Sequence, residues 1–146
     1  MEAAPRVFTL EAANALVPQL SSLVGRQLER RAAIEEHLGR LGRELGDVPE
    51  RIVLDPADPA PLRALKRELV ERIEEYRAGW REIEELGAVL KDPRRGLLDF
   101  YGTVDGRPVW LCWQYGEDRV GHYHGLEEGF AGRKPIDHDL RLRLLN

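Results

Sequence analysis

The sequence predicts an α+β protein, with a long antiparallel two-helix hairpin followed by a small three-stranded antiparallel meander and a C-terminal tail. Three observations support this prediction. Apolar residues recur three or four positions apart through two long segments, as in amphipathic helices. Four prolines and several aspartates interrupt that pattern over residues 46–61. After residue 96 the apolar period changes from helical to two, which is typical of strands.

The first helix is expected to begin at Thr9 and to end at Gly46. The Thr9 hydroxyl can cap its first turn, and Glu11 suits the positive end of the helix dipole. Pro18 lies inside the apolar stripe. Because proline has no N–H to donate, it predicts a kink or an early division of the helix.

The second helix is expected to begin at residues 58–61 and to reach Leu90. Its apolar steps alternate between three and four, which is the spacing of a coiled coil. A short connection between two long helices favours an antiparallel hairpin. Two helices alone leave part of each stripe uncovered, so we expect a homo-oligomer, and a dimer in particular, formed through the helices. The second stripe consists of Leu62, Leu65, Leu69, Ile73, Tyr76, Trp80, Ile83, Leu86 or Gly87, and Leu90.

Asp105-Gly106 predicts a two-residue hairpin turn of type I′ between two strands. That turn fixes which residues lie opposite each other. One face of the hairpin is then apolar, and we assign it to the helices; the other face is mixed and carries the candidate chemistry. The apolar pairs are Gly102–Val109, Phe100–Leu111 and Leu98–Trp113, and the mixed pairs are Tyr101–Trp110 and Asp99–Cys112.

A third strand is expected over residues 119–124, with His122 and His124 on the same face of it. The length of the preceding loop decides which face that is. A loop of two or four residues places both imidazoles on the apolar side, whereas a loop of three places them beside Asp99 and Cys112. The sequence leaves both registers open, because a slip of one residue moves every side chain to the other face.

In the second register Asp99, Cys112, His122 and His124 converge. Carboxylate, thiolate and imidazole are ligands expected for zinc or iron. Glu127, or its neighbour Glu128, follows the strand and could complete the ligand set or act as a base. Cys112 as a catalytic nucleophile would need a lowered pKa, for which the sequence supplies no cause.

The tail, residues 125–146, contains a glycine-rich turn at residues 129–133. Its backbone N–H groups and the Arg133 guanidinium could hold an anion, with Tyr101 and Trp110 as the walls of the pocket. The alternative is a tight turn that packs Phe130 into the core. Farther on, leucines alternate with charged residues at positions 140–144, which predicts an edge strand or an arm added to a partner's sheet.

The length of 146 residues fits a single domain, with the hairpin at residues 9–90, the sheet at residues 97–124 and the tail after it. A net charge of −4 without a concentrated basic face argues against nucleic acid as a partner. The only cysteine, Cys112, excludes an intrachain disulfide. No signal peptide is apparent, and no apolar run approaches the roughly 20 residues of a membrane span. We therefore expect a cytoplasmic protein without membrane contact.

Three segments together resemble the bacterial and archaeal family called domain of unknown function 2203: VFTLEAANALVPQL, KDPRRGLLDF and LCWQYGEDRVGHYHGLEEGFAGRKPI. The last is the most specific, because the family pattern has an aromatic–His pair, an acidic turn and a Gly-Phe-Ala-Gly-Arg segment. Here these are Tyr123-His124, Glu127-Glu128 and residues 129–133. The family more often has tryptophan at the position of Tyr123, and it has one histidine there, so His122 departs from its pattern. The resemblance implies no established activity.

The residues therefore have to carry the functional prediction. No HExxH motif, phosphate-binding loop or nucleophile elbow occurs, so we expect a small, non-catalytic, homo-oligomeric binding or assembly module, and enzymatic activity stays open. One alternative is a zinc or iron protein that uses Asp99, Cys112, His122, His124 and a nearby glutamate. Another is an anion or phosphate ligand bound at the glycine-rich turn by Arg133.

Overall fold

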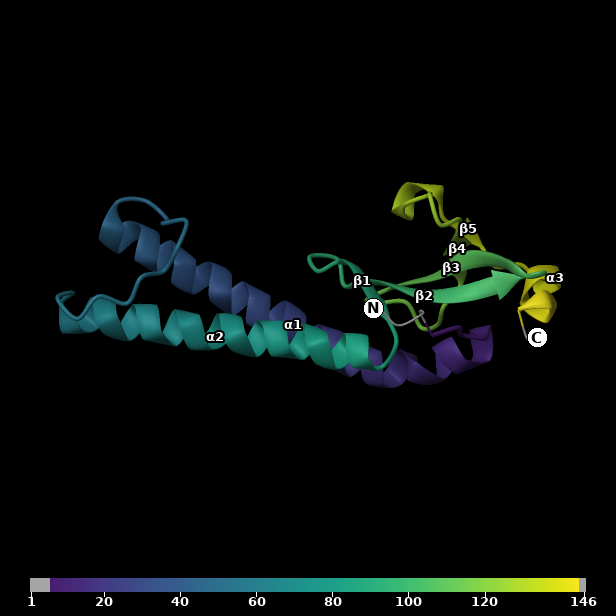
Figure 1. Ribbon diagram of the computed structural model, residues 1–146, viewed down its shortest axis with the longest axis horizontal. Coiled ribbons are helices and arrows are strands. Elements are labelled where there is room, and N and C mark those ends of the chain that lie inside the picture. Colours follow the sequence, from purple (N-terminus) through teal and green to yellow (C-terminus); the bar gives the residue numbers. More distant parts are fainter. Residues whose placement is uncertain (1–5, 145–146) are drawn as a thin grey trace, which may run out of the picture. The chain divides into compact units, whose positions relative to one another are not determined.

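The computed structural model describes residues 6–144, which hold two long helices, a five-stranded antiparallel sheet and a short C-terminal helix (Figure 1). The predicted α+β fold class is confirmed, but the sheet has five strands in place of the three expected. The chain forms two compact units. One consists of the chain up to Gly25 and from Glu82 onward, and the other of Arg26–Arg81. Among the described residues, no helix has the length and apolar character needed to span a bilayer.

Helix α1 spans Leu10–Leu45, close to the predicted bounds. Thr9 caps it as expected, because its Oγ1 accepts a hydrogen bond of 3.1 Å from the Ala12 N–H. Gly46 follows the last turn with φ of +86°, a left-handed conformation that glycine adopts without strain. Pro18 lies inside the helix and does not divide it.

Helix α2 spans Ala60–Glu85 and ends before the predicted Leu90. Leu90 belongs to strand β1, Val89–Asp92, and lies opposite Leu98 of the next strand. The helix ends because Gly87 takes φ of +106° against the Phe8 ring, where an added Cβ would lie 2.6 Å from Phe8 Cζ. Leu90 fitted the helical spacing by coincidence.

In the unit formed by Arg26–Arg81, the facing stripes of α1 and α2 make a narrow core. Ile34, Leu41 and Leu69 are buried in it. Gln27 is also buried, and its Nε2 donates a hydrogen bond of 2.6 Å to the Tyr76 carbonyl across the two helices. The partly buried apolar residues around this core are Leu38, Ile52, Leu62, Leu65, Ile73 and Tyr76.

The sheet follows the order β1-β2-β3-β4-β5 and is antiparallel throughout. Asp105 and Gly106 both have positive φ, 52° and 79°, as a type I′ turn requires, and every predicted pair between β2 and β3 is confirmed. The third predicted strand is shorter than expected. The strands after β1 are β2 (Leu97–Val104), β3 (Arg107–Gln114), β4 (His122–His124) and β5 (Lys134–Pro135).

The apolar face of β2 and β3 packs against the start of the chain. Phe8 and Phe100 stack edge to face with ring centroids 5.0 Å apart, and the Phe8 N–H donates to the Tyr101 carbonyl at 2.7 Å. Asn14 of α1 accepts a hydrogen bond of 2.7 Å from the Val120 N–H through its side chain. These contacts leave the opposite, mixed face for the candidate site. The fully buried residues of the apolar face are Leu98, Phe100, Leu111 and Trp113.

The edge strand predicted at residues 140–144 is wrong, because this segment forms helix α3, His138–Arg143. Asp137 caps it, and its Oδ1 accepts a hydrogen bond of 2.8 Å from the Leu140 N–H. Leu140 and Leu144, four positions apart, are buried, whereas Leu142 is exposed. The Asp137 cap favours a helix here, and in a helix Leu140 and Leu144 lie on the same face. The glycine-rich turn contains a short 3₁₀ helix, η1, Phe130–Gly132.

Candidate metal centre

The register of β4 decides the question that the sequence left open. Cys112 lies opposite both Asp99 of β2 and His122 of β4, and Trp110 lies opposite His124. Residues that pair directly share a face of the sheet, so both imidazoles lie on the side of Asp99 and Cys112. The register that brings carboxylate, thiol and imidazoles to one face is therefore the one that forms.

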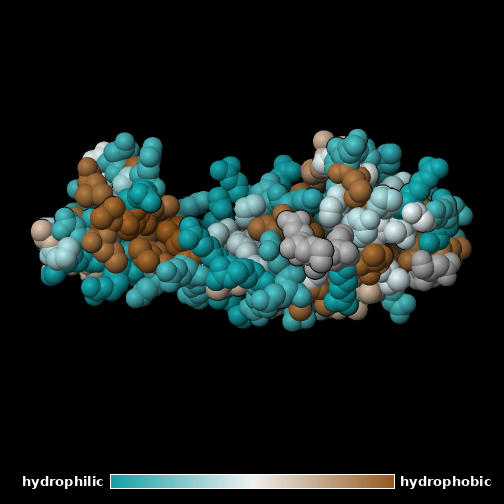
Figure 2. Space-filling model, viewed as in Figure 1, coloured by the Kyte–Doolittle hydropathy of each residue, from teal (hydrophilic) through white to brown (hydrophobic). Residues whose placement is uncertain are grey.

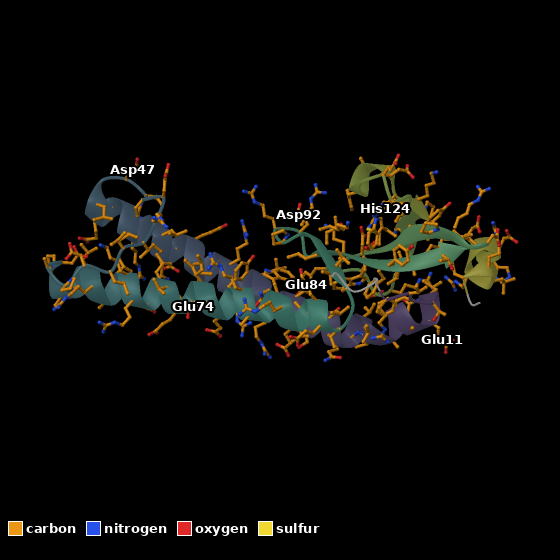
Figure 3. All side chains as sticks on the ribbon, viewed as in Figure 1. Glu11, Asp47, Glu74, Glu84, Asp92 and His124 are labelled. Carbon is orange, nitrogen blue, oxygen red and sulfur yellow. The ribbon has the colours of Figure 1, made fainter. Side chains whose placement is uncertain are left out.

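Asp99, Cys112 and His124 form a buried cluster on this face, and Figure 3 labels His124 at the sheet. Their exposed fractions are 1%, 0% and 4%. His124 Nε2 lies 2.8 Å from Asp99 Oδ2, and one ligand atom from each of the three residues lies within 4.8 Å of the others. Ligand atoms around a tetrahedral zinc ion are roughly 3.3–3.8 Å apart, given bond lengths of about 2.0–2.3 Å. Small side-chain movements would bring the three atoms to that spacing.

The second ring nitrogen of His124 fixes the orientation of the imidazole. Nδ1 lies 2.9 Å from the Gly125 carbonyl oxygen, which can only accept, so Nδ1 carries a proton and donates it. In the neutral ring Nε2 then holds the lone pair and points at Asp99. This is the arrangement in which a metal-binding histidine is held by a backbone carbonyl behind it.

Burial dominates the electrostatics of the cluster. It raises the pKa of the Asp99 carboxyl above its ordinary value, against the opposing effect of His124. It also raises the pKa of the Cys112 thiol to about 12, against the opposing effect of Arg133. Cys112 is therefore protonated at neutral pH, and the metal-free protein offers no thiolate nucleophile here. Asp99 Oδ1 is buried and has no hydrogen-bond partner within the described part of the chain.

His122 and Arg133 lie beside the cluster and contact Glu117. The Arg133 guanidinium makes two hydrogen bonds to the Glu117 carboxylate, at 3.1 and 2.8 Å, and its Nη1 lies 3.7 Å from Cys112 Sγ. His122 Nδ1 lies 3.5 Å from Glu117 Oε2. His122 thus shares the face of the cluster but points toward Glu117. Glu117 was not among the residues singled out from the sequence.

The aromatic pair predicted to wall an anion pocket does form. Tyr101 and Trp110 stack edge to face at 5.7 Å, and Lys91 Nζ lies 4.2 Å from the centre of the Trp110 ring. No ring contact or hydrogen bond links Arg133 to either aromatic residue in residues 6–144. The Arg133 guanidinium instead packs on Phe130, 4.7 Å from the ring centre.

A cavity of about 270 Å³ opens beside the cluster. Glu128 lines it and accepts a hydrogen bond of 2.9 Å from the Gly125 N–H, whereas Glu127 is exposed and is not part of the cluster. Sequence reasoning missed Lys91 and Phe130 as parts of this wall. Lys91 directly follows the segment that the sequence predicts as the second helix. For Phe130, no neighbouring residue in the sequence indicates what its ring contacts. The full lining is Lys91, Leu97, Asp99, His124, Glu128, Gly129 and Phe130.

The fold and the cluster define an α+β protein that carries a buried Asp–Cys–His group on the mixed face of an antiparallel sheet. Its residues 6–136 match the family model described as "Uncharacterized conserved protein (DUF2203)", and the chain belongs to that family. The match includes the whole candidate site and stops before α3. No curated protein and no solved structure matches the chain.

Proposed function

We propose that this protein binds a divalent transition metal, zinc or iron(II), through Asp99, Cys112 and His124. The observation that carries the proposal is a buried set of three different metal-ligating atoms within 4.8 Å, one of them on a carboxylate whose second oxygen has no hydrogen-bond partner. An ion between Nε2 and Oδ2 would replace the proton that these atoms share. The combination of thiolate and imidazole favours zinc over magnesium or calcium.

Elemental analysis of protein purified without chelator or affinity tag tests this function. We expect close to one equivalent of zinc or iron per chain, and a Cys112→Ser variant should lose most of it. Metal binding converts the thiol to a thiolate, so binding releases protons and weakens as the pH falls. Absence of metal after incubation with zinc and with iron(II) would contradict the proposal.

We further propose that the protein is a homodimer that pairs through the helical hairpin of the Arg26–Arg81 unit, at the end where α1 connects to α2. The supporting observation is an apolar patch on this unit, visible as brown surface around the connection between α1 and α2 in Figure 2. The apolar core cluster of this unit is small, with Ile34, Leu41 and Leu69 as its buried members. The exposed apolar residues of this surface are Leu45, Val48, Val53 and Leu54, each at least 44% exposed.

Light scattering at micromolar concentration tests the dimer. The wild-type chain should show twice the monomer mass, and Leu54→Asp should shift it toward the monomer. Leu142→Asp is the matched control, because Leu142 is 52% exposed and Leu54 is 54% exposed, but Leu142 lies on α3. A monomeric wild-type chain, or equal effects of the two variants, would reject this assembly.

A dimeric metal protein with a thiolate ligand also suits the cytoplasm, where thiols stay reduced.

A further inference from the structure

Three protein ligands leave a tetrahedral ion with one open coordination position. Asp99 and His124 both line the 270 Å³ cavity, whereas Cys112 does not. A metal held by the three residues would therefore have its open position on the side of the cavity. This arrangement resembles metal sites that accept a water molecule or an exogenous ligand more than closed structural sites, in which the protein supplies all four ligands.

The size of the cavity limits what can bind there. A water molecule takes up about 30 Å³ in the liquid, so the cavity holds more than a single water. It lies just below the roughly 300–1,000 Å³ typical of pockets for drug-sized molecules. A compound of a few heavy atoms fits this space.

The charges around the cavity favour an anion. Lys91 lies on the wall, and the Arg95 guanidinium packs on the Phe130 ring at 4.8 Å. Glu128 is the one acidic wall residue besides Asp99, whose charge the metal would balance. Arg133 is already neutralised by Glu117. Lys91 is thus the one cation among the lining residues, and it forms no salt bridge within residues 6–144, so its ammonium is available to a bound anion.

We propose that the cavity binds a small carboxylate whose oxygen occupies the open position on the metal. The Lys91 ammonium balances the charge of the carboxylate, and the side chains of Leu97 and Phe130 contact a short apolar tail. Phe130 is held as a fixed wall because guanidinium groups lie near its ring at 4.8 Å (Arg95) and 4.7 Å (Arg133). This inference rests on the metal site proposed above.

Cobalt(II)-loaded protein provides the test, because the visible absorption bands of cobalt report its ligands. Titration with propionate should shift these bands saturably, and Lys91→Met should raise the propionate dissociation constant about tenfold at unchanged cobalt stoichiometry. Lys134→Met is the control, since Lys134 lies on the exposed strand β5 and outside the cavity lining. Phe130→Ala should weaken propionate more than formate, which has no apolar tail.

The outcomes separate the two proposals. If the chain binds no cobalt, the metal site fails, and the carboxylate pocket fails with it. If cobalt binds with a thiolate charge-transfer band but propionate leaves the spectrum unchanged, the metal site stands and the pocket is rejected. A response to inorganic phosphate but not to propionate overturns the carboxylate assignment, and equal effects of Lys91→Met and Lys134→Met overturn the role of Lys91.

Discussion

Replacing His124 with alanine should weaken zinc binding by at least about 100-fold. In structural zinc sites, four protein ligands together contribute about 10–16 kcal/mol of binding free energy, so each contributes on the order of 3 kcal/mol. Loss of one ligand then raises the dissociation constant more than about 100-fold. The Gly125 carbonyl already orients the ring, so Nε2 meets a metal without a further loss of side-chain freedom. Competition with a chromophoric chelator measures the change in dissociation constant.

His122→Ala is the matched control for this prediction. His122 lies two residues away on the same strand and the same face, but its Nδ1 faces Glu117 at 3.5 Å. We expect its removal to change zinc affinity by less than about tenfold, because its side chain contacts Glu117 and none of the three ligands, whereas direct partners of metal ligands account for about 10–100-fold. Equal losses in the two variants would show that the site is not the Asp99–Cys112–His124 cluster.

Removing His124 also leaves Asp99 buried without its partner, which could destabilise the fold by itself. Cys112→Ser separates these effects, because serine keeps nearly the same volume and removes the thiolate. It should lower zinc affinity to a similar extent while the circular dichroism spectrum stays unchanged. If Cys112→Ser binds zinc as tightly as the wild-type chain does, sulfur is not a ligand and the proposed site is wrong.

The pairing of β2 and β3 could be predicted from the sequence because its determinants are local. Asp105 and Gly106 accept the positive φ angles of a type I′ turn, and this turn fixes every pair along both strands. The Asp99–Cys112 pair therefore follows from two turn residues. Two of the three residues of the cluster could therefore be placed on one face from local sequence signals alone.

The register of β4 could not be predicted because side-chain hydrogen bonds, one of them from a distant part of the chain, hold the connection before it. Asn14, 106 positions earlier in the chain, accepts a hydrogen bond from the Val120 N–H. The Glu117 side chain accepts one from the Gln114 N–H, and the Glu117 carbonyl accepts one from Trp113 Nε1. From the loop length alone, His124 could lie on either face of the sheet, and these contacts favour the face of Asp99 and Cys112.

The edges of the sheet were missed for a related reason. Strand β1 is short, and Leu90 continues the helical spacing of the preceding stripe, so only the left-handed turn at Gly87 marks the boundary. Strand β5 has two residues and exists through its pairing with His122 and Tyr123. Strands of this length are too short to show an alternating apolar pattern in the sequence. Because β1 was not predicted, Lys91 was not predicted as part of the cavity wall.

Trp113 supports the site from the apolar side of β3, and Trp113→Ala should cost about 3–5 kcal/mol of unfolding free energy, as other large-to-small aromatic core substitutions do. Its side chain is fully buried, and its Nε1 donates to the Glu117 carbonyl at 2.9 Å. Trp110→Ala, on the same strand but on the partly exposed face, should cost roughly 1–2 kcal/mol. Urea unfolding followed by far-ultraviolet circular dichroism measures both.

If Trp113→Ala does not fold at all, Trp113→Phe provides the measurable variant. Phenylalanine keeps the apolar contact and removes the indole N–H, so the Glu117 carbonyl loses one hydrogen bond, worth about 1 kcal/mol. Because Glu117 also holds Arg133 and faces His122, the loss should loosen the connection between β3 and β4 and slightly weaken metal binding. Equal destabilisation by Trp110→Ala and Trp113→Ala would contradict the deeper burial of Trp113 on the apolar face.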